Sequence, residues 1–293
     1  MRLGKVAALV LLSIPALYLV RVGGAQAGVR AVVSIPPQQY FVEKVGGGLV
    51  EVTVMVPPGA NAHTYEPRPR QMTALSKADV YFSIGVEFEK TWLGRFKAAH
   101  RNLLLIDTAK DIRRIPMESR QGSGHDGREQ PGSDPHIWLS PRLVALQAQA
   151  VRDGLVRADP AHQAVFEENL TAFQKELRLL DEELRSGFRG LGEHKRILVF
   201  HPAWGYFCRD YGLVQVAVEK EGKEPTARGM KHLIEQARES GAKIIFVQPQ
   251  FSTRAAETVA QAVGGRVVRL DPLAQDWADN MKKVARLLRK AIF

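Results

Sequence analysis

Cysteine is almost absent from this sequence: Cys208 is the only one among its 293 residues. A single cysteine excludes a disulfide within the chain. Because Cys208 lies in a run of aromatic residues, we expect it to be a buried apolar side chain and not a nucleophile. The sequence also contains no HExxH motif, no nucleophile elbow and no phosphate-binding P-loop. The enzyme classes that carry these motifs are therefore disfavoured.

Long apolar runs are also rare, and the one that stands out lies at the start of the chain. Residues 6–20 are nearly all apolar, follow two basic residues and precede the small-x-small site Ala25-Gln26-Ala27. This order predicts a cleaved secretory signal peptide over residues 1–27 and an exported mature protein that begins at Gly28. No cysteine follows the run, which argues against a lipid anchor there. An uncleaved membrane anchor is the alternative.

Basic residues outnumber acidic ones, with 41 Lys and Arg against 31 Asp and Glu and a formal net charge of +10. Removing residues 1–27 takes away three basic residues and lowers this charge from +10 to +7. The basic residues are scattered along amphipathic segments and form no dense run. We therefore expect no nucleic-acid binding, and we interpret the charge as a source of solubility and of docking to an acidic partner.

Residues 160–190 show the most regular pattern in the chain. Apolar residues recur there at steps of three and four, with charged residues between them. The pattern predicts one helix of roughly 40 Å, with Asp159 as its N-cap and Pro160 at its first position. Since this length is the width of a whole domain, we expect the helix to link two lobes; a core helix of one large domain is the alternative. The apolar positions are Phe166, Leu170, Phe173, Leu177, Leu180, Leu184 and Phe188.

The chain on either side of this helix alternates strand-like and helix-like segments. Residues 28–159 and residues 191–293 therefore predict an α/β fold of two lobes, each with a parallel sheet covered by helices. In the first lobe, residues 116–133 lose almost all apolar side chains and are interpreted as an exposed flexible loop. This loop contains His125, a lone histidine that we expect to be solvated.

Four side chains of the kinds that bind metals lie where strands or loops of the two lobes end. His201 and Asp271 follow two predicted strands of the second lobe, His63 lies in the loop after a strand of the first lobe, and His136 precedes a helix. Because ligands of α/β sheets bind beyond the carboxyl ends of the strands, these side chains can converge between the lobes. Three imidazoles and one carboxylate suit zinc better than manganese or calcium. The histidines left outside the site are His100, His162, His194 and His232.

Six motifs resemble, in order along the chain, the periplasmic solute-binding proteins of zinc and manganese ABC transporters, the ZnuA-like and TroA-like family (cluster A-I). Together they span nearly all of the chain after residue 27. The motifs are residues 57–67 (PPGANAHTYEP), 134–139 (DPHIWL), 200–207 (FHPAWGYF), 224–226 (EPT), 244–251 (IIFVQPQF) and 270–273 (LDPL).

This resemblance implies two α/β lobes bridged by one long rigid helix, with a metal bound in the cleft between them. It implies that His63, His136, His201 and Asp271 are the ligands of a periplasmic receptor, not an enzyme, that delivers Zn²⁺ to an ABC permease in the inner membrane. A monomer is expected, and a periplasmic zinc chaperone is a further candidate partner. Manganese members tend to carry Glu at the third position, so His201 indicates zinc.

The chain departs from the family pattern in three places. Asn61-Ala62 stands where Asp-Pro is usual, which removes a carboxylate that could orient His63. Gln248 stands where Glu is common, and the loop of residues 116–133 has little histidine, which argues against zinc scavenging by that loop.

Other functions remain open at this point. One is a manganese or iron receptor of the same family. A zinc-dependent hydrolase would need a general base, for which Glu66 is the candidate, and a metal position open to water; four protein ligands would close that position. A receptor for a metal chelate would need a wide cleft lined by Arg or Tyr.

The predicted histidine ligands also imply a pH dependence. Imidazoles must be neutral to bind zinc, and the ordinary histidine pKa is about 6.5. Zinc affinity is therefore predicted to fall as the pH drops below that value.

Overall fold

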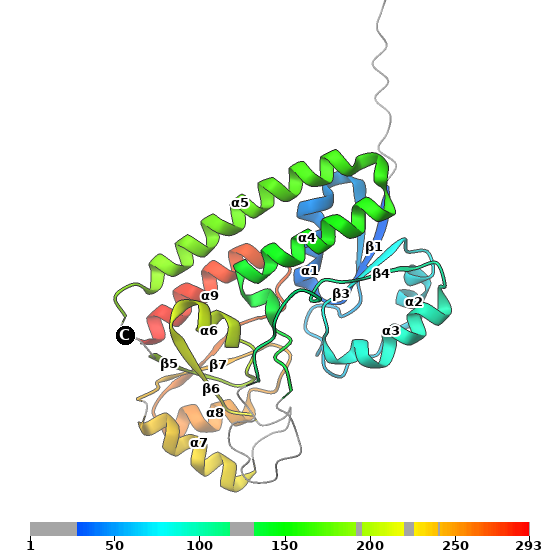
Figure 1. Ribbon diagram of the computed structural model, residues 1–293. Helices are drawn as coiled ribbons and strands as arrows, with labels where there is room; N and C mark the ends of the chain where they lie inside the picture. The colour runs from blue at the N-terminus through cyan, green and yellow to red at the C-terminus, as the bar shows by residue number, and fades with distance from the viewer. Residues whose placement is uncertain (1–27, 118–131, 192–194, 220–225, 240, 293) are drawn as a thin grey trace, which may run out of the picture.

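The computed structural model describes residues 28–117, 132–191, 195–219, 226–239 and 241–292. Two lobes lie side by side, and a long helix runs along both of them (Figure 1). Each lobe contains a four-stranded parallel sheet covered by helices. The predicted α/β class with two lobes and a bridging helix is thus confirmed. None of the helices in the described part of the chain is long and apolar enough to cross a membrane.

The sheet of the first lobe has the strand order β2-β1-β3-β4, with every neighbouring pair parallel. The strand β3 is buried along its whole length, whereas the edge strand β2 is partly exposed. Such burial explains why the inner strands are mostly apolar, with the exposed Arg30 of β1 as an exception. The strands are β1 (Val29–Val33), β2 (Val50–Val54), β3 (Val80–Ser83) and β4 (Leu104–Asp107), and the helices are α1 (Pro36–Gly46), α2 (Pro69–Leu75), α3 (Glu87–Ala99) and α4 (Pro141–Ala158).

The sheet of the second lobe repeats this order as β6-β5-β7-β8, again with parallel neighbours. Its short helix α6 covers the aromatic run, where the sequence pattern does not indicate a helix, and buries Cys208 as predicted. The strands are β5 (Lys195–Val199), β6 (Leu213–Ala217), β7 (Ile244–Val247) and β8 (Arg266–Arg269), and the helices are α6 (Gly205–Tyr211), α7 (Ala227–Glu239), α8 (Arg254–Ala262) and α9 (Trp277–Ile292).

The bridging helix α5 spans Gln163–Phe188, and all seven of its predicted apolar positions are buried. Its start differs from the prediction. Pro160–His162 form a separate 3₁₀ turn (η4), and Asp159 makes no capping bond with its side chain. The Asp159 carboxylate instead accepts a hydrogen bond from Nδ1 of His162 at 2.6 Å, so it is not free to bond the first backbone N–H groups of the helix.

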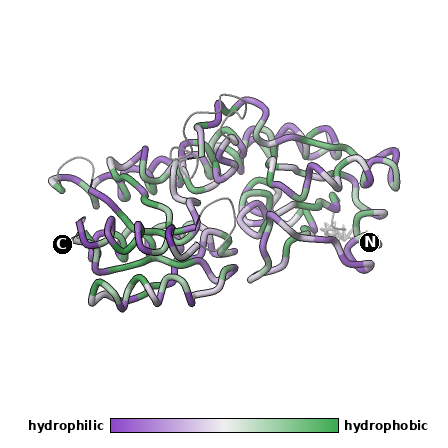
Figure 2. Tube along the Cα trace, turned by 90° about the horizontal axis from the view of Figure 1, so that it is seen from below, coloured by the Kyte–Doolittle hydropathy of each residue, from purple (hydrophilic) through white to green (hydrophobic). Residues whose placement is uncertain are grey.

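Aromatic side chains from both lobes and from α5 form a common apolar core. The Trp277 ring of α9 contacts Phe41 of α1 edge-on at a centroid distance of 5.2 Å, and Phe41 in turn contacts Phe173 of α5 at 6.3 Å. Trp138 donates to the carbonyl of Pro272 and accepts from the indole of Trp277, both at 2.7 Å. These contacts hold the lobes together without help from a ligand. Hydrophilic and hydrophobic residues alternate along the helices, as expected when each helix buries one face (Figure 2).

Several predicted features fall wholly or partly outside the described residues. These are the signal peptide of residues 1–27, residues 118–131 with His125, His194, and Glu224-Pro225 of the motif at residues 224–226. Pro116 and Ser133 form an isolated antiparallel bridge, so the two ends of the predicted loop lie side by side.

Candidate metal centre

Three of the predicted ligands converge between the lobes. His63 lies in the loop after β2, His136 lies just before the short 3₁₀ helix η3 (Ile137–Leu139), and His201 lies two residues after β5. Their Nε2 atoms are close, at 3.2 Å from His63 to His201 and 3.3 Å from His201 to His136. In a tetrahedral zinc site with Zn–N bonds of 2.0–2.1 Å, two nitrogen ligands lie about 3.3–3.4 Å apart. Both observed distances therefore suit a tetrahedral zinc site.

Two buried carboxylates orient two of these imidazoles. Nδ1 of His136 donates to Asp134 Oδ1 at 2.7 Å, and Nδ1 of His201 donates to Glu219 Oε1 at 2.6 Å. The four residues are between 1% and 5% exposed. Because each Nδ1 carries the proton of the neutral ring, each Nε2 presents its lone pair to a metal.

Further contacts fix the backbone and the ring of His201. Gln248 accepts from the His201 backbone N–H at 3.1 Å and donates from its amide to the His201 carbonyl at 2.6 Å. An ionised glutamate at this position could only accept hydrogen bonds. The glutamine that replaces the usual glutamate therefore allows both bonds to the His201 backbone. The ring of Phe251 stacks on the His201 ring at 4.8 Å.

His63 is held differently from the other two histidines. The side chain of Asn61 accepts from the backbone N–H of His63 at 2.8 Å and so shapes the loop. Within the described residues, no carboxylate bonds to Nδ1 of His63. The change from Asp-Pro to Asn61-Ala62 therefore leaves His63 as the ligand without a carboxylate partner.

Asp271 lies next to this cluster and is not part of it. In the described part of the chain, the group of metal-ligating side chains within 4.8 Å of one another contains only the three histidines. Asp271 follows β8, and its Oδ1 accepts from Nε2 of Gln250 at 2.8 Å and from the backbone N–H of Leu273 at 2.9 Å. Gln250 and Leu273 line one small cavity together with the three histidines. The assignment of Asp271 as the fourth ligand stays a prediction.

The surroundings of the cluster favour neutral imidazoles. Burial, together with the neighbouring rings of His201 and His136, lowers the pKa of His63 to about 3. Burial is also the main cause that lowers the pKa of His201; its hydrogen bond to Glu219 opposes the shift. Because only neutral imidazole binds a metal, these two ligands are ready for binding at neutral and mildly acidic pH.

These shifts move the pH dependence of zinc binding to lower pH than the sequence alone predicts. At pH 5.5, three imidazoles with a pKa of about 6.5 would each lose roughly tenfold to protonation, or about a thousandfold together. With two of the three pKa values lowered, we expect the zinc affinity to fall less than about a hundredfold between pH 7.5 and 5.5. A competition titration corrected for the protonation of the chelator measures this, and a thousandfold loss would contradict it.

The same shifts have a consequence for the stability of the protein without zinc. A histidine with a lowered pKa in the folded state binds protons more readily when the chain unfolds. The contribution of the lowered pKa of His63 to the free energy of unfolding is fully present above pH 6.5, and it is lost as the pH falls toward 3. Denaturant titrations at pH 7, 5.5 and 4.5 should show that the free energy of unfolding falls less steeply with pH in a His63→Ala variant than in the wild type.

Glu219 was not among the site residues predicted from the sequence. It follows β6 by two residues, and β6 pairs in parallel with β5, so their carboxyl ends meet beside His201. The sequence signal that could have identified Glu219 is its position as a carboxylate shortly after β6, the strand that pairs with β5. Oε2 of Glu219 is buried without a hydrogen-bond partner among the described residues, which shows that this carboxylate is poorly satisfied apart from its bond to His201.

We expect Glu219→Ala to weaken zinc binding by about 10- to 100-fold, the usual cost of losing the partner of a histidine ligand. Without the acceptor, the ring of His201 can rotate and place its proton on Nε2. Glu219→Gln keeps an acceptor and should give a smaller loss, while Glu239→Ala, an exposed position on α7, serves as the control. Equal zinc affinities for all four proteins would show that Glu219 does not orient His201.

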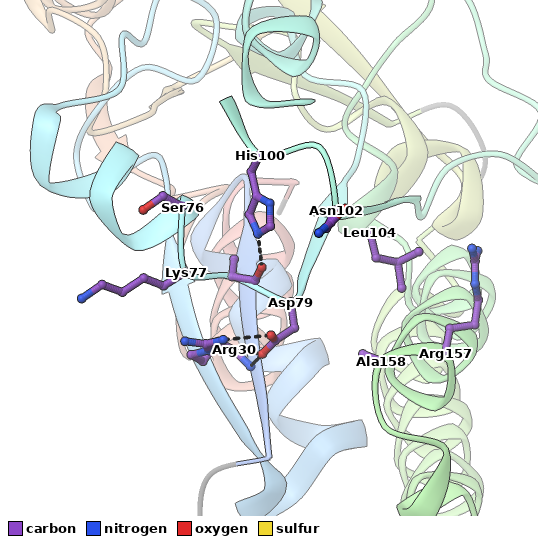
Figure 3. Close-up of a pocket in the computed structure, with 10 residues that line it drawn as sticks. Arg30, Ser76, Lys77, Asp79, His100, Asn102, Leu104, Arg157 and Ala158 are labelled. Carbon is purple, nitrogen blue, oxygen red and sulfur yellow. Dashed lines mark hydrogen bonds and ion pairs between the residues drawn. The ribbon is translucent and has the colours of Figure 1, made fainter. Parts of the chain in front are cut away.

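A larger cavity lies at the opposite, amino end of the first sheet and does not form a competing site. It has a volume of about 620 Å³ and is lined by several basic residues, which spread apart around it (Figure 3). Arg30 is paired with Asp79 at 3.0 Å, and His100 bonds the carbonyl of Ala78. The lining residues Ser76, His100 and Arg157 lie in the last turns or caps of α2, α3 and α4, where basic side chains complement the negative ends of helices.

A buried cluster of imidazoles between two α/β lobes joined by a long helix defines a metal-binding protein of the solute-receptor class. Comparison with known proteins agrees. The model of the family described as "ZnuA: Zinc-uptake complex component A periplasmic" matches residues 31–291. The chain therefore belongs to the ZnuA family, whose members are the solute-binding components of ABC transporters, work with a membrane permease and are not enzymes.

Similar individual proteins share most of the length of the chain. A solved structure described as "Crystal structure of ZnuA" is 44% identical, with a TM-score of 0.84, and the match covers 91% of this chain and 100% of that one. A deletion mutant of ZnuA with zinc bound is 45% identical over 90% of this chain and 98% of that one, with a TM-score of 0.82. A putative metal-binding protein of Chlamydia trachomatis is 27% identical over 87% of this chain and 89% of its own length.

Proposed function

We propose that this chain is a periplasmic receptor that binds one Zn²⁺ ion and delivers it to an ABC permease in the inner membrane. The observation that carries the proposal is the distance of His201 Nε2 from the Nε2 atoms of His63 and His136, 3.2 and 3.3 Å, which fits tetrahedral zinc. Family membership supports it, as does the similar ZnuA deletion mutant that holds zinc.

The donor set favours zinc over manganese or iron. Nitrogen ligands suit zinc, whereas manganese prefers more oxygen. The third position is a histidine, and its Nδ1 is already bonded to Glu219. We propose Asp271 as the fourth ligand, since the loop that carries it also lines the cavity of the three histidines. A set of four protein ligands leaves no metal position for water, and Glu66, the candidate base of a hydrolase, is exposed.

The cellular setting is part of the same proposal. Residues 1–27 act as a cleaved signal peptide, the mature protein begins at Gly28, and it works as a monomer. The permease is its main partner, and a periplasmic zinc chaperone is a second candidate partner. The basic charge of the mature chain supports docking to acidic surfaces on such partners.

Elemental analysis of the mature protein, purified without added metal, tests the proposal. We expect one zinc per chain, with manganese and iron together below about a tenth of that amount. Deleting the gene should also slow growth in medium depleted of zinc, with rescue by added zinc and not by manganese. Protein loaded mainly with manganese or iron, or a zinc content far below one per chain, would overturn the proposal.

A further inference from the structure

Asp271 is held through only one of its two carboxylate oxygens. Oδ1 accepts both from Nε2 of Gln250 at 2.8 Å and from the backbone N–H of Leu273 at 2.9 Å, and neither bond uses Oδ2. The backbone of Asp271 is fixed separately, because Asn280 donates to its carbonyl at 2.7 Å. Main chain and side chain of Asp271 are thus each positioned, and Oδ2 is the oxygen left for a metal.

Gln250 is placed to act on both Asp271 and the metal. It lines the small cavity together with His63, His136 and His201. Its amide orientation is set by chemistry, because only the NH₂ group can donate to a carboxylate. Oε1 is consequently turned away from Asp271, and it is buried without a hydrogen-bond partner in the described part of the chain.

An unpartnered buried acceptor is unfavourable for folding and needs an explanation. A methionine of similar length would avoid this cost, since it has no strong acceptor to satisfy. The amide therefore contributes something other than stability, and the contact with Asp271 is the contact that a methionine would lose.

We propose that Gln250 is a positioning residue that restricts Asp271 to binding the metal through one oxygen, Oδ2, and thereby favours zinc over manganese. An oxygen that accepts two hydrogen bonds has both lone pairs engaged, so Oδ1 is a poor second ligand atom. A carboxylate that binds through one oxygen completes a four-coordinate site with three imidazoles, as zinc prefers. Ions that prefer more oxygen ligands gain from a carboxylate that binds through both. The inference rests on the proposed function, with Asp271 as the fourth ligand.

Gln250→Met tests the inference, with Gln261→Met on the exposed face of α8 as the matched control. Zinc and manganese affinities are measured by competition titration, and the coordination number of bound zinc by X-ray absorption. We expect the ratio of zinc to manganese affinity to fall at least about tenfold in Gln250→Met, and the zinc coordination number to rise above four. The melting temperature of the variant without metal should equal or exceed that of the wild type, which separates positioning from a structural role.

A second background shows whether Gln250 acts through Asp271. In an Asp271→Asn protein, adding Gln250→Met should change the affinity ratio less than about twofold, because the group that Gln250 positions is gone. A full tenfold change in that background would overturn the inference, as would an unchanged ratio in Gln250→Met alone. If the wild-type protein binds no zinc, the proposed function fails; if it binds zinc and Gln250→Met behaves as the control does, only the role of Gln250 fails.

Discussion

Replacing His63 and His136 together by alanine should abolish stoichiometric zinc binding. Four-ligand zinc sites contribute about 10–16 kcal/mol, so two ligands account for roughly 5–8 kcal/mol. The expected loss is at least about 10⁴-fold in affinity. This pair removes both histidines contributed by the first lobe and leaves His201 with its bond to Glu219 intact.

The pair is chosen so that the variant still folds. Removing His201 would leave the buried carboxylate of Glu219 without its hydrogen-bond partner, which is costly. His63 has no such partner, and the Asp134 carboxylate keeps the backbone N–H of residue 136 at 2.9 Å. We expect the far-ultraviolet circular dichroism of the variant to match the wild type.

Chelator competition measures the loss, and replacing His162 and His232 together by alanine provides the control. His162 bonds Asp159 at the start of α5, and His232 is exposed on α7, so neither faces the cluster. The control should bind one zinc with wild-type affinity. Retention of zinc within about tenfold of the wild type by the His63 and His136 variant would show that the metal lies elsewhere.

Zinc should raise the melting temperature of the protein by about 8–16 °C. A ligand that binds only the folded state stabilises it by about 4.1 kcal/mol when its free concentration is a thousand times the dissociation constant. For a chain of this size, each kcal/mol corresponds to roughly 2–4 °C. The two lobes already share an aromatic core with Phe41, Phe173 and Trp277, so the shift measures zinc binding and not the assembly of separate lobes.

Differential scanning calorimetry with zinc or with chelator gives the shift directly. Manganese at the same concentration should produce a smaller shift, because the cluster offers mainly nitrogen. The variant with alanine at both His63 and His136 should have the same melting temperature with excess zinc as with chelator. Equal melting temperatures of the wild type with excess zinc and with chelator would contradict tight binding to the folded state.

Local patterns in the sequence predicted the elements that depend on neighbours along the chain. The predicted apolar positions of α5 are confirmed as buried, because a helical period is set by residues three and four apart. The helix predicted after His136 is α4, and it begins with a bond from the Leu143 backbone N–H to the Ser140 side chain, again a contact within one turn. The predicted start of α5 was wrong because two local interactions of Asp159 compete there. Its carboxylate accepts from the side chain of His162 and not from the backbone N–H groups that a cap would bond.

What the sequence by itself determined is the fold class, the burial of α5, and which histidines follow the strands and loops at the metal-binding end of each lobe. What only the tertiary structure decided is how those side chains meet. The Nε2 atoms of His63 and His201, 3.2 Å apart, belong to residues 138 positions apart along the chain, and Glu219 reaches His201 only because β5 and β6 pair in parallel. The hydrogen bond from Gln250 to Asp271 likewise joins residues 21 positions apart. Such contacts depend on the relative placement of strands and loops, and periodicity along the chain carries no information about that placement.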